Sequence, residues 1–242
     1  MFSRARSSWK AVIIALVLAV PASLAGGPLA VNADVVANAC PVLHAGDILR
    51  VEQTAFYYQL NANLQLLYFP NSDVQRSWAV NGSDSSTYTG VSVACYDALK
   101  LPGRLPFGAD FFPGTYLVKD MFHEQLYVVE PHQVLVKITP EAALALYGLN
   151  GLYKTQIIDD VQWYNYVISH EPAITMGSKP HPGMLLSAQG KIWFVADEKI
   201  VREVTPSGLA ANRFQLRFAR PMNDLTLANF NAGPKIDGKI EL

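Results

Sequence analysis

The histidines are the first side chains to consider for chemistry, because imidazole titrates near neutral pH and is a common metal ligand. No two of them have the i, i+4 spacing that places two imidazoles on one helix face for zinc. His123 and His170 are each followed by glutamate, and neighbours on a strand point to opposite faces. We therefore expect exposed loop histidines, no metal site and no cofactor. The five are His44, His123, His132, His170 and His181.

Carboxylates and nucleophiles supply one enzymatic alternative. The sequence has no G-x-S-x-G turn, no glycine-rich phosphate loop and no D-x-[DN]-x-[DN]-G calcium loop. Asp159 and Asp160 could assist an acid–base step, or one of them could cap the helix that follows. The alternative is a hydrolase acting on wall or glycan. It would be favoured if a polar cleft held at least two of the four residues Asp159, Asp160, His123 and His170 within about 4 Å of each other. No residue is assigned as catalytic.

The composition excludes several classes of protein. Of the 242 residues, 50% are hydrophobic and 16% are charged, which is enough apolar material for a core and too little charge for disorder. The formal net charge of −1 supplies no basic surface, so we expect no nucleic-acid partner. The 15 prolines and 16 glycines indicate many turns and favour β structure.

The N-terminus predicts export. Arg4, Arg6 and Lys10 precede ten apolar residues at 11–20, a length typical of a signal peptide, whereas a spanning helix needs about 20. We expect a signal peptide over 1–33 and a secreted or cell-surface protein. Cleavage would remove three of the 19 basic residues and none of the 20 acidic ones, leaving a net charge of −4. If uncleaved, this segment would be the chain's membrane contact.

The two cysteines are a pair to consider together. Cys40 and Cys95 are the only cysteines of the chain, and export would take them to an oxidising compartment where disulfides persist. We predict that they are bonded. The alternative is two buried free thiols.

Three similar stretches of sequence indicate an internal repeat. Gly46, Gly114 and Gly183 each open a stretch in which two strand-like runs follow. In the second run, apolar residues recur at every second position back from the closing proline, with Arg202 as the one exception, which is the pattern of a half-buried strand. Each run ends at a proline, and a helix is expected after it, with Thr139 and Thr205 as N-caps in the second and third copies. The prolines are Pro70, Pro140 and Pro206.

These patterns predict a mainly β fold with short helices, of the α+β class. We expect three tandem units, each a β-meander with one or two short helices, packed into one compact domain. The units are assigned to residues 46–112, 113–181 and 182–242, after an N-terminal segment at 34–45. Helices are predicted over 72–78, with Ser72 starting a capping box, over 141–147, stopped by Gly148, and over 207–214.

Several motifs carry a resemblance to a known group. They are Gly46-Asp47-Ile48-Leu49, Tyr68-Phe69-Pro70-Asn71, Trp78, Pro113-Gly114 and Asp159-Asp160-Val161. Together they resemble the tandem-repeat extracellular module of uncharacterised secreted or surface proteins from ultra-small candidate-phylum bacteria. The resemblance covers about residues 40–175, and the placing of the two cysteines fits it. The resemblance implies export but no activity. This sequence departs from the group's pattern at 61–64, where a glycine is missing, and at Leu152-Tyr153, where a tryptophan is expected.

The aromatic side chains are the remaining groups that could bind a ligand, since Tyr and Trp are enriched at interfaces. Those at equivalent repeat positions are expected to pack between repeats, because each repeat needs neighbours to bury its apolar face. This applies to Tyr58, Tyr127 and Trp193. The aromatics in variable loops are the ligand-binding candidates, and these are Tyr88, Tyr153 and Tyr164.

The sequence therefore favours an exported, non-catalytic repeat module for recognition or surface association. Its partner would be an extracellular glycan, peptide or protein. The two alternatives are the secreted hydrolase described above and a purely structural surface scaffold.

Overall fold

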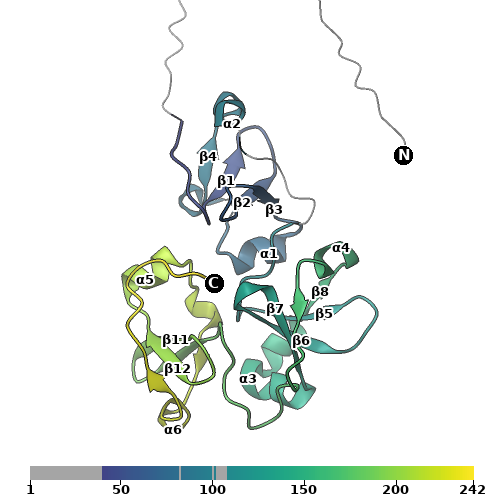
Figure 1. Ribbon diagram of the computed structural model, residues 1–242, viewed down its shortest axis with the longest axis vertical. Coiled ribbons are helices and arrows are strands. Elements are labelled where there is room, and N and C mark those ends of the chain that lie inside the picture. The colour runs from purple at the N-terminus through teal and green to yellow at the C-terminus, as the bar shows by residue number, and fades with distance from the viewer. Residues whose placement is uncertain (1–39, 82, 100, 102–107) are drawn as a thin grey trace, which may run out of the picture. The chain divides into compact units, whose positions relative to one another are not determined.

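The computed structural model describes residues 40–81, 83–99, 101 and 108–242, without the side chains of 224 and 225. The signal peptide predicted over 1–33 lies outside these residues. Figure 1 shows strands and short helices recurring along the chain. None of the helices in the described part is long and apolar enough to cross a membrane.

The first repeat forms a four-stranded sheet. Its third, second and first strands pair antiparallel in that order, and a fourth strand lies parallel to the first. The strands are β1 (Ile48–Val51), β2 (Tyr57–Leu60), β3 (Leu66–Tyr68) and β4 (Thr89–Val91), and the helices are α1 (Ser72–Ser77), α2 (Val93–Leu99) and the 3-10 helix η1 (Ser85–Thr87).

The second repeat has the same arrangement with one strand more. Three strands form an antiparallel meander, a fourth lies parallel to the first and a fifth lies parallel to the third. The strands are β5 (Leu117–Asp120), β6 (Leu126–Glu130), β7 (Val134–Ile138), β8 (Gln156–Ile158) and β9 (Val167–Ile168). The helices are α3 (Pro140–Tyr153), α4 (Asp160–Trp163) and the 3-10 helix η2 (Pro131–Gln133).

The third repeat matches the second strand for strand. Its strands are β10 (Leu185–Ala188), β11 (Lys191–Val195), β12 (Ile200–Glu203), β13 (Arg220–Pro221) and β14 (Asn231–Ala232). Its helices are α5 (Pro206–Ala211), α6 (Asp224–Leu227) and the 3-10 helix η3 (Leu216–Phe218). The predicted α+β class with repeated β-rich units is confirmed, while the boundaries of the units stay predictions.

The opening glycines occupy equivalent places in the three sheets. Their φ angles are 82°, 70° and 91°, a left-handed conformation that glycine adopts without the steric cost of a Cβ. This conformation turns the backbone N–H toward a carbonyl near the end of the second strand, at 2.6 to 2.9 Å. The pairs are Gly46 with Leu60, Gly114 with Val129 and Gly183 with Val195.

The prolines stand between strand and helix, as predicted. Thr139 and Thr205 are the N-caps of α3 and α5, with proline at the first helical position. For α1 the capping prediction is wrong, because the Asn71 side chain accepts the N–H groups of Asp73 and Val74 and leaves Ser72 inside the helix. Gly148 does break α3, with φ 68° and ψ 173°, but helical turns resume and run on to residue 153.

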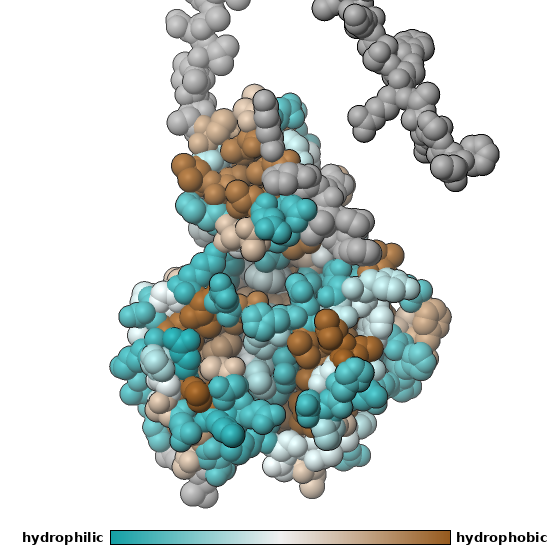
Figure 2. All heavy atoms as spheres, in the orientation of Figure 1, coloured by the Kyte–Doolittle hydropathy of each residue, from teal (hydrophilic) through white to brown (hydrophobic). Residues whose placement is uncertain are grey.

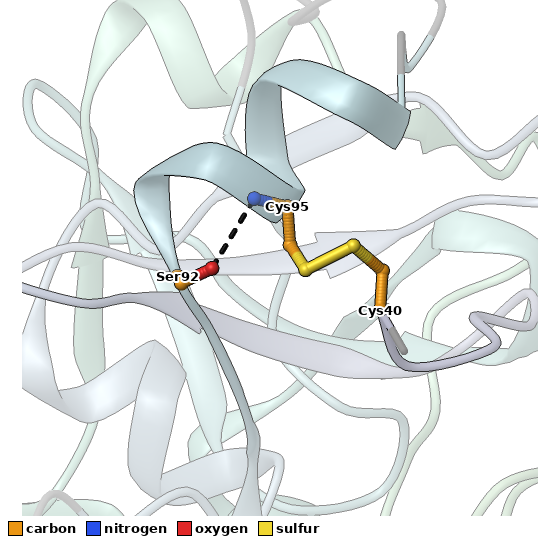
Figure 3. Close-up of a disulfide and its surroundings, with 3 residues drawn as sticks. All are labelled: Cys40, Ser92 and Cys95. Carbon is orange, nitrogen blue, oxygen red and sulfur yellow. Dashed lines mark hydrogen bonds between the residues drawn. A yellow bond between two sulfur atoms is a disulfide. The ribbon is translucent and has the colours of Figure 1, made fainter. Parts of the chain in front are cut away.

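The predicted disulfide is present and ties the start of the described chain to α2. Cys40 is bonded to Cys95, whose N–H donates to Oγ of Ser92 at 3.2 Å (Figure 3). The bond lies in an apolar cluster of first-repeat residues, among them Leu49 and Tyr58, against which Cys40 and Leu43 of the preceding segment also pack. The alternative of two free thiols is excluded in this structure.

We expect the purified, unreduced chain to resist thiol alkylation, because both sulfur atoms are bonded to each other. Mass spectrometry after iodoacetamide treatment should show no adduct. The same sample, reduced and unfolded first, should show two. Alkylation of both cysteines without reduction would contradict the disulfide.

Three apolar clusters join the repeats to one another. One contains Tyr57 of the first repeat and Tyr127 of the second, and another joins the second and third repeats and is flanked by Trp193. A further cluster in the third repeat includes Phe112 from residues 110–113, which we call the linker because the first repeat ends and the second begins there. Tyr127 and Trp193 thus lie in or against inter-repeat clusters, whereas Tyr58 packs inside its own repeat.

Candidate functional site

A cavity of about 1160 Å³ is lined by residues of all three repeats. Cavities of this kind are the default place to look for a binding site, especially where polar groups converge. The first repeat contributes the turn between β2 and β3, the second contributes the turn between β6 and β7, and the third contributes the end of α5 and the residues after 238. The linker 110–113 supplies part of the wall.

Asp110 is a buried carboxyl in this wall. Its side chain is 7% exposed, and Oδ1 accepts a hydrogen bond from Nδ2 of Asn165 at 2.7 Å. Burial raises the pKa of Asp110 to about 7, against the opposing effect of its hydrogen bonds with Asn165 and Gln133. A carboxyl with a perturbed pKa in a cavity is a feature of functional sites.

The turn that carries Gln133 is backbone-strained. His132 and Gln133 have φ angles of 62° and 61°, and left-handed backbone is uncommon for residues other than glycine. Both side chains are exposed and line the cavity. Strained residues of this sort cluster at binding and catalytic sites, where the surrounding structure holds them in place.

Trp78 gives the cavity part of its apolar surface. Its ring is half-buried and stands edge-on to Phe112, with centroids 4.9 Å apart. Nε1 of Trp78 donates to the carbonyl of Asp110 at 2.6 Å, which fixes the ring against the linker. Leu67 and Val129 extend the same apolar surface.

Both signs of charge face the cavity. Arg213 is half-buried, and its Nη1 donates to the carbonyl of Thr87 at 2.8 Å. Lys239 donates through Nζ to the carbonyl of Ala45. In the described part of the chain, neither cation forms an ion pair with a carboxylate, although Asp47 and Glu241 line the same cavity.

The three aromatic binding candidates lie elsewhere. Tyr88 packs edge-on against Tyr57, with centroids 5.2 Å apart, and accepts a hydrogen bond from Arg50. Tyr153 and Tyr164 are 81% and 78% exposed at the ends of α3 and α4. None of the three lines the cavity, and ligand binding by them stays a prediction.

Within the described residues, no hydrogen bond or ion pair joins the side chains named for the hydrolase alternative to one another. His123 bonds Asp120 through Nδ1 at 2.8 Å on an exposed loop, and His170 is exposed after β9. Asp159 is the N-cap of α4 and accepts the N–H of Gln162, while Asp160 begins that helix. Within the described ranges no group of three side chains is placed to hold a metal ion.

His181 departs from the expectation of exposed histidines, since it is 3% exposed. Its Nε2 lies 2.6 Å from the Tyr147 hydroxyl and its Nδ1 lies 2.8 Å from the carbonyl of Pro182. Burial lowers the pKa of His181 to about 4, against the hydrogen bond to Pro182. The neutral ring therefore connects α3 to the start of the third repeat. Its position beside Pro182 in the sequence gave no sign that the side chain would be buried.

The large exposed apolar residues are spread over all three repeats. On the face that Figure 2 shows, hydrophilic side chains predominate and the apolar ones form separate patches. Phe122 and Met121 at the β5–β6 turn are among the most exposed. Scattered exposed apolar residues are normal on a protein surface.

Comparison with known proteins identifies no family for the chain. No protein-family description matches it, and no curated protein does. Among solved structures, it is similar to a chain of the periplasmic assembly from the ESX-5 inner membrane complex. The TM-score is 0.22 at 11% identity, and the match covers 86% of this chain and 71% of that one. A chain of an intact ESX-5 inner membrane complex matches with TM-score 0.22 and 12% identity, over 85% of this chain and 61% of that one. The similarity is therefore distant, and the resemblance to the candidate-phylum module rests on the sequence motifs alone.

Proposed function

We propose that the chain is an exported, non-catalytic recognition module that binds an extracellular ligand in the cavity lined by its three repeats. The observation that carries the proposal is the convergence of Gln133, Trp78 and Arg213, one from each repeat, on one cavity. These groups are far apart in the sequence, and the packing of the repeats brings them together.

The disulfide supports an extracytoplasmic location. Bonds such as Cys40–Cys95 form and persist in oxidising compartments and are rare in the cytosol. Export agrees with the basic and apolar residues at the N-terminus. Secretion or retention at the cell surface would place the cavity in contact with envelope and extracellular material.

Cavity-narrowing variants test the recognition function. Ala211 is exposed and lines the cavity, whereas Ala145 is exposed on α3 and does not. Ala211→Trp should fill part of the cavity, and Ala145→Trp is its matched control. The full chain, immobilised, is presented with the polysaccharides and proteins of extracellular and envelope extracts.

The expected result is a component that wild type and Ala145→Trp retain and Ala211→Trp loses. Retention by Ala211→Trp should be strongly reduced, because the indole takes up volume that the ligand would otherwise occupy. If all three proteins retain the same components equally, the cavity is not the binding site. Such a result would favour the structural scaffold instead.

A further inference from the structure

The second strand of the first repeat carries a polar residue at a position that is core elsewhere. Aligning the repeats on the opening-glycine hydrogen bonds makes Leu60, Val129 and Val195 equivalent. The residue before each is then Gln59, Val128 or Phe194. Val128 and Phe194 are 0% and 3% exposed. Gln59 is half-buried and lines the cavity.

The Gln59 amide has no hydrogen-bond partner within the described residues. Because Gln59 is only half-buried and lines the cavity, its amide can bond water there, and a ligand can replace that water. A polar residue at a position that is apolar and buried in the other two repeats is the kind of exception that is expected at functional sites. The Gln59 side chain is therefore available to a ligand.

Two other polar side chains of the cavity are also planar and can form paired hydrogen bonds. Gln133 presents an amide from the strained turn, with bonding capacity beyond its contact with Asp110, and Arg213 has further N–H groups beyond its bond to Thr87. An amide offers a donor and an acceptor side by side, and a guanidinium offers several donors in a plane. Adjacent hydroxyl groups, each both donor and acceptor, match such side chains.

The charges of the cavity favour no ionic polymer. Arg213 and Lys239 contribute two cations, Asp47 and Glu241 contribute two carboxylates, and Asp110 adds a buried carboxyl, so neither sign of charge is in large excess. Binding of a polyanion or a polycation depends on an excess of the opposite charge. The ligand class that fits is neutral, with polar groups on its edge and apolar faces that can lie against Trp78.

We propose that the cavity binds a neutral oligosaccharide, with the Gln59 and Gln133 amides bonding its hydroxyl groups and Trp78 packing against a sugar ring. This inference rests on the proposed recognition function and specifies its ligand class. The volume of about 1160 Å³ exceeds the roughly 300–1,000 Å³ of most small-molecule pockets, so more than one ring fits.

The test compares Gln59→Val with Gln156→Val in the full chain. The first restores the residue type that the second repeat has at this position, and is expected to fold. The second changes a half-buried glutamine of β8 that does not line the cavity. Calorimetric titrations use cellohexaose, chitohexaose and maltohexaose as neutral probes, with hexagalacturonate and a mixed-sequence hexapeptide as comparators.

We expect at least one neutral hexasaccharide to bind wild type and Gln156→Val equally, and Gln59→Val at least about tenfold more weakly, since two hydrogen bonds are lost. The tryptophan fluorescence of the protein, to which Trp78 contributes, should change on binding. Binding of hexagalacturonate or the peptide alone, equal affinity of Gln59→Val, or no binding of any probe would each overturn the inference. The recognition function would still stand in those cases if Ala211→Trp abolished retention from the extracts, and both would fail if it did not.

Discussion

Replacing Gly114 by alanine is expected to destabilise the fold by roughly 4 kcal/mol or more. A Cβ at Gly114 would lie 2.2 Å from the carbonyl oxygen of Gly183 and 2.8 Å from the nitrogen of Met184. These are backbone atoms, which cannot move aside as a side-chain end can. The φ of 70° adds the cost of left-handed backbone, about 1–3 kcal/mol.

The expected readout is a fall in melting temperature of about 10 °C, since 1 kcal/mol corresponds to roughly 2–4 °C in a domain of this size. Gly177→Ala is the matched control, because Gly177 has φ 88° and, its chain neighbours apart, no atom of the described chain lies within 4 Å of where its Cβ would stand. That variant should lose only about 1–2 kcal/mol. Equal melting temperatures for the two variants would contradict the close contact between the opening glycines.

Asp110→Asn is expected to stabilise the protein at alkaline pH. Burial raises the pKa of Asp110 from 3.8 to about 7, so the folded state binds a proton more tightly than the unfolded state does. Its contribution to stability therefore falls as pH rises from about 4 to about 7, and the full penalty is present above 7. The penalty is about 4 kcal/mol at most, at 1.36 kcal/mol per pKa unit.

Asparagine removes the penalty and keeps an Oδ1 acceptor for Asn165. Urea unfolding should show Asp110→Asn more stable than wild type by about 2–4 kcal/mol at pH 8, with the difference shrinking toward pH 4.5. Asp84→Asn is the control of opposite sign, because hydrogen bonds from Ser86 lower the pKa of Asp84. If the difference in unfolding free energy between Asp110→Asn and wild type did not change with pH, the raised pKa of Asp110 would be disproved.

Local features of the fold could be predicted from the sequence because their causes are local. A glycine that must turn the chain and a Thr-Pro pair that must begin a helix act within a few residues, as at Gly183 and Thr205. The parallel strands β9 and β14 could not be predicted in this way. Each is two residues long, which is too short for a period-two pattern. Each forms by pairing with the edge strand of a meander, β9 with β7 and β14 with β12.

The cavity could not be predicted because its walls come from three repeats and its shape depends on their packing. One signal was present in the sequence. Gln59 interrupts a strand of otherwise apolar and aromatic character, at the position where its counterparts are Val128 and Phe194. The tyrosines in variable loops, Tyr88, Tyr153 and Tyr164, were a different signal, and none of them lines the cavity.

The hydrogen bonds between the first and third repeats have a consequence for how the protein unfolds. Nε2 of Gln215 donates to the carbonyls of Arg76 and Ser77 at the end of α1, and Arg217 also donates to Arg76. Linear repeat arrays, in which units touch only sequence neighbours, can fray from an end one unit at a time. Here the last unit also holds the first, so neither end can detach without losing these hydrogen bonds and separating Trp78 from the third-repeat cluster. Unfolding should be all-or-none, and loss of the last unit should cost the others their stability.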